Sequence, residues 1–292
     1  MSVRAGRLAL LAYVFALSFV FIRVYSGHSV FMLLNAADEG GYFAYTQALF
    51  HTHTFDWCDP RFENSDYDNI CRPPAGEKPG RPSNISSPGP ALSLLPFTAV
   101  GFSLNKLGVL SQGALNADLR FWSVVGTFFL FLGGLLLLFE LGMRWGLGST
   151  QSFWITFFFG LGNPLLYYVF RRPLMAHATE FFWITALLFL CFGRVSLREG
   201  RRIALIGAAA AMVLITRLNV GPALGAIPIV VLAQTSSPFK KRLRSLLWLL
   251  QGGLIPLAIF LLIQYGQRGT FLYSPGSYDP GTFKPENGFW SQ

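Results

Sequence analysis

The chain has 292 residues, of which 52% are hydrophobic, 16% aromatic and only 13% charged, and its mean hydropathy is +0.46. Several apolar runs approach the roughly 20 residues that a helix needs to cross a bilayer. The sequence therefore predicts an all-α, polytopic membrane protein. The formal net charge is +9, but Lys and Arg fall in short clusters between apolar runs, where they set membrane orientation. Nucleic acid is therefore not an expected partner.

The first apolar run covers residues 8–22 and has basic residues on both sides. Arg4 and Arg7 precede it, and Arg23 can lengthen it by snorkelling. The run is either an uncleaved first span or a signal peptide, and the lack of an A-x-A cleavage site favours the span. In both cases the segment that follows is exported.

We expect residues 27–119 to form one long outer loop that carries interfacial helices. Its first part holds the adjacent acids Asp38 and Glu39 at the start of a short aromatic helix. Two neighbouring carboxylates at a bilayer surface repel each other and lose hydration, so they need a cation, a metal or hydrogen-bond donors nearby, as a catalytic base does. The alternative is that Asp38 only caps the helix, where its charge suits the helix dipole.

The middle of this loop is polar and rich in proline. Cys58 and Cys71 could close a disulfide in an oxidising compartment, or remain free thiols. Further along, residues 92–102 carry apolar side chains at a spacing of three to four, which predicts a helix with one apolar face. Pro96 and Lys106 favour a position along the membrane interface, and a crossing is the alternative.

The remaining apolar runs complete a topology of about seven spans, with the amino terminus inside and residues 267–292 outside. The runs cover residues 121–141, 153–170, 181–192, 203–215, a second stretch that ends at 233, and 246–263. The basic residues near positions 4–7, 144, 194–202 and 240–244 then all lie on the inner side. Gly133-Gly134 and Gly252-Gly253 lie inside apolar runs and indicate helix packing, not a nucleotide-binding loop.

Three arginines break this charge rule. Arg171, Arg172 and Arg217 lie at the outer ends of spans, at the same surface as the acid pair. Arginines at membrane depth are costly and are therefore functional candidates, and guanidinium groups match phosphate oxygens. The alternative is that they snorkel or pair with the acid pair or with Glu180. Residues 203–233 are short for two full spans, so the turn after Arg217 is expected to line a polar cavity.

His177 and Glu180 are three residues apart, a spacing that places both on one face of a helix. They could form a metal pair, a substrate clamp or only a local hydrogen bond. A divalent ion with oxygen and nitrogen ligands would need further donors. Those that could complete such a site are Asp38, Glu39, Glu77, His51 and His53.

Several elements in chain order resemble the polyprenyl-phosphate-dependent GT-C glycosyltransferases, in the branch of the protein O-mannosyltransferases and the lipid A aminoarabinose transferases. They are the acid pair after the first span, the Tyr-containing helix after it, Glu77-Lys78-Pro79, the Pro-Gly-Pro-x-Leu-x-Leu-Leu-Pro run at 88–96, and Asp118-Leu119-Arg120. The resemblance implies one GT-C-like module over residues 1–292, multi-pass in the plasma (inner) membrane. Its active site would face the periplasm or exterior. Because such enzymes usually continue into further spans or a soluble domain, we expect this chain to end early.

The resemblance also implies roles for individual residues. Asp38 matches the catalytic acid of the first outer loop, and Glu39 follows as its partner. Lys78 would contact the lipid phosphate. His177 lies in the segment similar to the second outer loop of the family.

The resemblance implies an enzyme that moves a hexosyl or pentosyl group from a polyprenyl-phosphate donor to a hydroxyl of a glycan, lipid or protein acceptor, and the chemistry of the residues suits this reaction. Asp38 would deprotonate the acceptor, and the outer-face arginines or Lys78 would stabilise the departing phosphate, with or without a divalent ion. The main alternative is a transporter or lipid flippase, in which Arg217 lines the substrate path. A structural subunit of a membrane assembly is a third possibility.

Overall fold

The computed structural model is a bundle of helices. It describes residues 2–26, 37–56, 59, 62, 84, 86–109, 115–193, 197–217, 227–228 and 239–268. Every regular element in these ranges is helical, which confirms the predicted all-α class. In chain order the elements are α1 (Val3–Ser26), α2 (Ala37–Gln47), the π-helix η2 (Ala48–Thr52), α4 (Gly89–Lys106), α5 (Leu115–Arg144), α6 (Ser149–Leu161), α7 (Leu165–Arg171), α8 (His177–Phe192), α9 (Glu199–Thr216) and α11 (Phe239–Arg268).

Three helical segments are long and apolar enough to cross a membrane: Val3–Tyr25, Ala117–Arg144 and Phe239–Gln267. The pair α6 and α7 forms a fourth candidate, although the two helices are bent by 54° at a short break. The apolar helix α8 has only 16 residues. The described part of the chain therefore has three to four candidate spans. The count of about seven stays a prediction.

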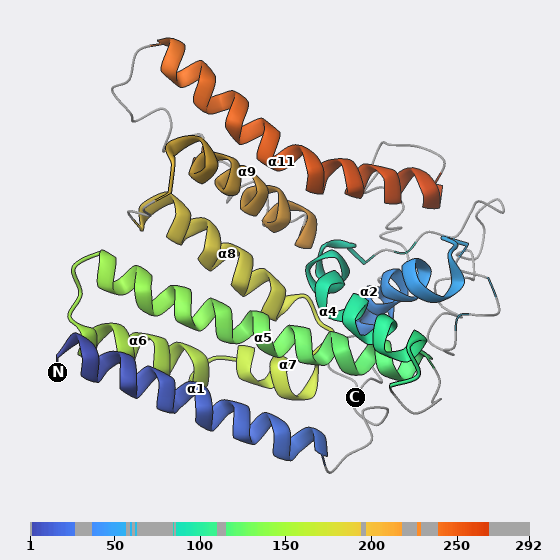
Figure 1. Cartoon of the computed structure of the whole chain (residues 1–292), viewed down its shortest axis with the longest axis horizontal. Helices are drawn as coiled ribbons and strands as arrows, with labels where there is room; N and C mark the ends of the chain where they lie inside the picture. The colour runs from blue at the N-terminus through green and yellow to red at the C-terminus, as the bar shows by residue number, and fades with distance from the viewer. Residues whose placement is uncertain are drawn as a thin grey trace, which may run out of the picture.

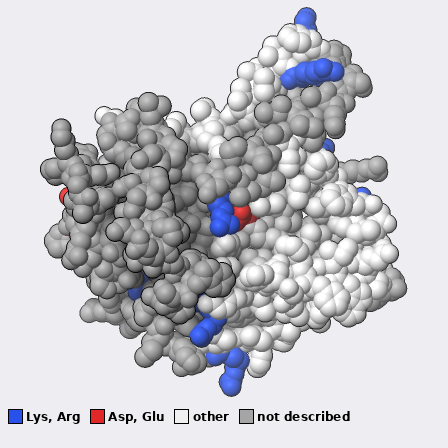
Figure 2. Space-filling view, turned by 180° about the vertical axis from the view of Figure 1, so that it is seen from behind, with Lys and Arg blue, Asp and Glu red and all other residues white. Residues whose placement is uncertain are grey.

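The long helices run side by side, and the lateral surface of the bundle is apolar. Figure 1 shows α1, α5, α8, α9 and α11 in this arrangement, with α6 and α7 alongside α1 and α5. Between them, Phe21 of α1 stacks on Phe128 of α5 with 4.1 Å between the ring centroids. The described part of the rear face carries few charged groups (Figure 2), and Phe15 and Ile255 are 74% and 68% exposed. Such a surface suits contact with lipid chains.

The two ends of the bundle differ in their charge. One end, which we call the basic end, holds the starts of α1, α6, α9 and α11 and the ends of α5 and α8 (Figure 1). Arg7 pairs there with Glu140 at 3.0 Å, and Lys241 lies 3.5 Å from Glu199. The opposite end, which we call the polar end, holds α2, η2, the ends of α1, α7 and α9 and the start of α8. Basic clusters that were predicted to share one side of the membrane thus share one end of the bundle.

The described elements of the predicted outer loop, α2, η2 and α4, lie near the polar end (Figure 1). Helix α4 packs on the N-terminal part of α5, where Gly101 lies against Trp122. At its end, Asn105 donates a hydrogen bond of 2.6 Å to Asp118. That this loop is exported stays a prediction. Cys58 and Cys71 lie outside the described residues.

Helices α9 and α11 run in the same direction and their backbones touch. A methyl group added at Gly207 would overlap the carbonyl group of Leu249, and one added at Gly252 would overlap the backbone of Ala204. Both positions therefore need glycine. The prediction that Gly252 packs between helices is confirmed.

Candidate active site

Glu39 lies in the first turn of α2 and is fully buried. Its Oε2 atom is 3.4 Å from Nη1 of Arg172, the residue that follows α7, and the two side chains are 0% and 33% exposed. A hydrogen bond with the Tyr167 side chain raises the pKa of Arg172, burial acts in the opposite direction, and the Glu39 carboxylate raises it further. Arg172 therefore stays a cation beside a buried carboxylate.

A second group of polar side chains surrounds Glu180 on the first turns of α8. Arg217, which follows α9, donates a hydrogen bond of 2.9 Å to Oε2 of Glu180. Nδ1 of His177 lies 3.9 Å from the same oxygen, and its ring packs on Tyr168 with 3.8 Å between centroids. The predicted common face of His177 and Glu180 is confirmed. Arg217 forms the pair with Glu180 that was one of its predicted roles, and its phosphate-binding role stays a prediction.

A cavity of about 600 Å³ opens between α5, α8 and the junction of α6 with α7. His177 and Glu180 line it at the polar end, and Leu188 lines it further along the same helix. Leu188 is eleven positions after His177 in the same helix, which corresponds to ~16 Å along the axis. The rest of the lining is mostly apolar and includes Leu138 and Phe181. The cavity is thus a long apolar pocket with ionisable groups near one end.

The break between α6 and α7 contributes residues that sequence reasoning missed. Residues 153–170 were predicted as one continuous span, but the chain bends after Leu161. Asn163 lines the cavity, and its side chain accepts a hydrogen bond of 2.6 Å from the backbone N–H of Leu165 at the start of α7. The sequence pattern that could have predicted this break is Asn163-Pro164, because an Asn-Pro pair marks a turn and Pro disfavours helix at the residue before it.

Comparison of the chain with protein-family models, with curated proteins and with solved structures gave no match.

The other predicted site residues divide into two groups. Asp38 lies in the first turn of α2, but its side chain is outside the described part, as are Glu77 and Lys78. Arg171 ends α7 and is exposed. In the described ranges no group of three His, Cys, Asp or Glu side chains could hold a metal ion.

The arrangement offers a defined set of chemical functions. Arg172 and Arg217 provide fixed positive charge at the polar end, and guanidinium groups suit phosphate oxygens. Glu180 and His177 can accept or donate protons where the apolar cavity begins. An amphiphile with a charged head and a long apolar chain would match both parts.

Proposed function

We propose that the chain is a membrane glycosyltransferase that uses a polyprenyl-phosphate sugar as donor. The acceptor would be a hydroxyl group of a glycan, a lipid or a protein. The polar end would face the periplasm or the exterior of the plasma (inner) membrane. This assignment places the basic end inside, as the positive-inside rule requires.

The observation that carries the proposal is the shape of the cavity. Its apolar length of ~16 Å below His177 suits several isoprene units, whereas a water-soluble nucleotide sugar would find few polar partners there. The charged groups at its polar end would face the phosphate of the donor. Arg217 is 43% exposed and carries five N–H donors, of which only one bonds to Glu180 in the described contacts.

The proposed step is a displacement at the anomeric carbon of the sugar. The acceptor oxygen forms a bond to this carbon while the bond from the carbon to the phosphate oxygen breaks. The electron pair leaves with the polyprenyl phosphate, whose charge Arg217 or Arg172 stabilises, with Arg171 and Lys78 as further candidates. The acceptor proton passes to Asp38, with Glu39 beside it as a positioning residue.

A divalent metal ion would not fit well at His177 and Glu180 alone. The two side chains supply only two ligands, and Arg217 lies 2.9 Å from the carboxylate, where its charge opposes a cation. Glu77, the predicted third ligand, lies outside the described residues. The proposed step is therefore written with side chains of this chain alone, and transfer assayed with and without a chelator tests the predicted divalent ion.

A transfer assay tests the proposal directly. The purified chain, in lipid nanodiscs, is incubated with a short-chain polyprenyl-phosphate sugar, and both donor binding and loss of sugar from the lipid are measured. Asp38→Asn should lower turnover by roughly two to four orders of magnitude, the usual size of a general-base contribution, and leave donor binding nearly unchanged. Asp56→Asn makes the same chemical change at an exposed site and should keep full turnover.

Two results would contradict the proposal. Absence of donor binding by the unaltered chain would remove the transferase assignment. Lipid movement across vesicles without any sugar transfer would support the transporter alternative. If Asp38→Asn keeps normal turnover, the base assignment is wrong, and Glu39 and Glu180 are the next candidates.

A further inference from the structure

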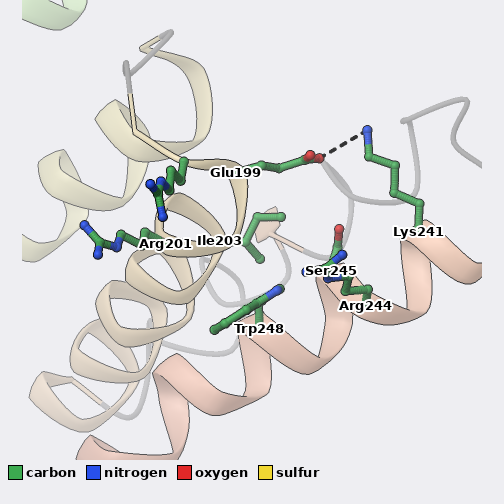
Figure 3. Close-up of a pocket in the computed structure, with 9 residues that line it drawn as sticks. Glu199, Arg201, Ile203, Lys241, Arg244, Ser245 and Trp248 are labelled. Atoms are coloured by element: carbon green, nitrogen blue, oxygen red, sulfur yellow. Dashed lines mark ion pairs between the residues drawn. The ribbon is translucent and has the colours of Figure 1, made fainter.

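A second cavity, of about 410 Å³, lies at the basic end between the starts of α9 and α11 (Figure 3). Its lining is strongly cationic. Four basic side chains and one acidic side chain contribute, which gives a net formal charge of +3. They are Arg198, Arg201, Lys241, Arg244 and Glu199, and Ser245 and Trp248 complete the α11 side.

The side chains around this cavity leave positive charge available to a ligand. Lys241 and Glu199 face each other across the opening (Figure 3) at 3.5 Å, but they are 53% and 63% exposed. Such an exposed ion pair is weak and can be exchanged for another anion. Arg244 lies on the α11 wall, while Arg201 extends away from α11 and can contact a ligand only from the rim.

The depth of the cavity is limited by helix packing. Trp248 lies against Gly200, and a few residues further along, the backbones of α9 and α11 touch at Gly207. A ligand can therefore place only a small head group between the helices. The first backbone N–H groups of α9 lie at the same level and also favour an anion.

The outer surface next to the cavity is apolar. Leu205, one turn after Arg201, is 46% exposed, and Leu247, beside Trp248, is 59% exposed. Tryptophan is common at the boundary between lipid and water. The cationic cavity thus lies where a candidate membrane span begins, with lipid-facing side chains directly below it.

We propose that this cavity binds the phosphate-bearing head group of an anionic phospholipid, with the acyl chains along the exposed leucines. Basic pockets between membrane helices bind such head groups elsewhere. Free phosphate would satisfy the same cations, but it would not explain the apolar flank. This site lies at the opposite end from the proposed transferase site and does not depend on that assignment.

Lipid binding to the purified chain in detergent micelles tests the proposal. The probes are phosphatidylglycerol, zwitterionic phosphatidylcholine and inorganic phosphate, and bound lipid is counted by native mass spectrometry. The double variant Lys241→Gln with Arg244→Gln should weaken phosphatidylglycerol binding about tenfold, since each basic residue near an anionic head group adds to the binding free energy. The matched control, Lys240→Gln with Arg242→Gln, removes the same charge from the same turns but outside the lining, and its effect should stay below about threefold.

A third variant separates charge from shape. Ser245→Leu keeps every charge and fills part of the cavity, so it should also weaken phosphatidylglycerol binding. If the double charge variant does not fold, Ser245→Leu still tests the site. If the matched control loses as much affinity for phosphatidylglycerol as the double variant of the lining, the attraction is a general effect of the basic surface and the proposed site is wrong. Equal binding of both phospholipids, or displacement of phosphatidylglycerol by excess inorganic phosphate, would overturn the lipid assignment.

Discussion

The ion pair between Arg172 and Glu39 gives the sharpest test of how the polar end is built. With 3.4 Å between the charged atoms, Coulomb attraction at an effective dielectric constant of 20 is about 5 kcal/mol. Because Arg172 is 33% exposed, solvent reduces this value, and the cost of burying Glu39 offsets a further part. We expect a coupling energy of about 2 kcal/mol.

A double-mutant cycle measures this coupling. Arg172→Ala should lower the free energy of unfolding by about 3 kcal/mol, because it leaves a fully buried carboxylate without this cation. Glu39→Gln should cost about 2 kcal/mol, since the charged hydrogen bond is lost while the shape is kept. The double variant should then cost about 3 kcal/mol, not the 5 kcal/mol of independent sites.

Unfolding in mixed micelles with increasing dodecyl sulfate, followed by tryptophan fluorescence, supplies these free energies. Arg171→Ala is the matched control, because this neighbouring arginine is exposed and has no ion pair within the described residues. It should cost less than about 0.5 kcal/mol. A coupling energy below about 0.5 kcal/mol would show that Arg172 and Glu39 do not interact, and the account of the polar end would fail.

Three further predictions concern the cavity and the helix packing. Arg217→Ala should weaken binding of a polyprenyl-phosphate sugar about tenfold to a hundredfold in equilibrium binding but leave binding of the uncharged polyprenol unchanged, since the proposed contact of Arg217 with the ligand is to its phosphate. Equal losses of affinity for both ligands would refute a phosphate contact. Leu188→Trp should raise KM and leave kcat unaltered in steady-state kinetics, because it fills the far part of the cavity, whereas Leu188→Met should change neither. Gly207→Leu should lower the unfolding free energy by about 2 to 3 kcal/mol, because α9 and α11 must separate; an unchanged unfolding transition would contradict the backbone contact.

The apolar helices and their charged ends could be predicted because hydropathy is a local property. Residues 121–141 were predicted as a span from composition alone, and α5 contains them. The common face of His177 and Glu180 also follows from local geometry, since three residues cover most of one helical turn. Such features need no knowledge of tertiary structure.

The partners of these residues could not be predicted in the same way. Glu180 and Arg217 are 37 positions apart, and only the packing of α8 beside α9 brings them together. The same holds for the cavity at the basic end, where residues of two clusters that indicated membrane orientation line one cavity. The bend after Leu161 was missed because the apolar run continues through it, and hydropathy does not register a change of helix direction.

The close contact between α9 and α11 has a consequence for how the protein is made. The first residue of α11 follows that of α9 by 40 positions, so at synthesis rates of about 5 to 20 residues per second α9 is complete seconds before its partner. During this interval Gly207 and the face of α9 around it have no partner from α11. A nascent chain stalled before Phe239 should therefore hold α9 loosely, and the helix should become firmly embedded only after α11 has left the ribosome.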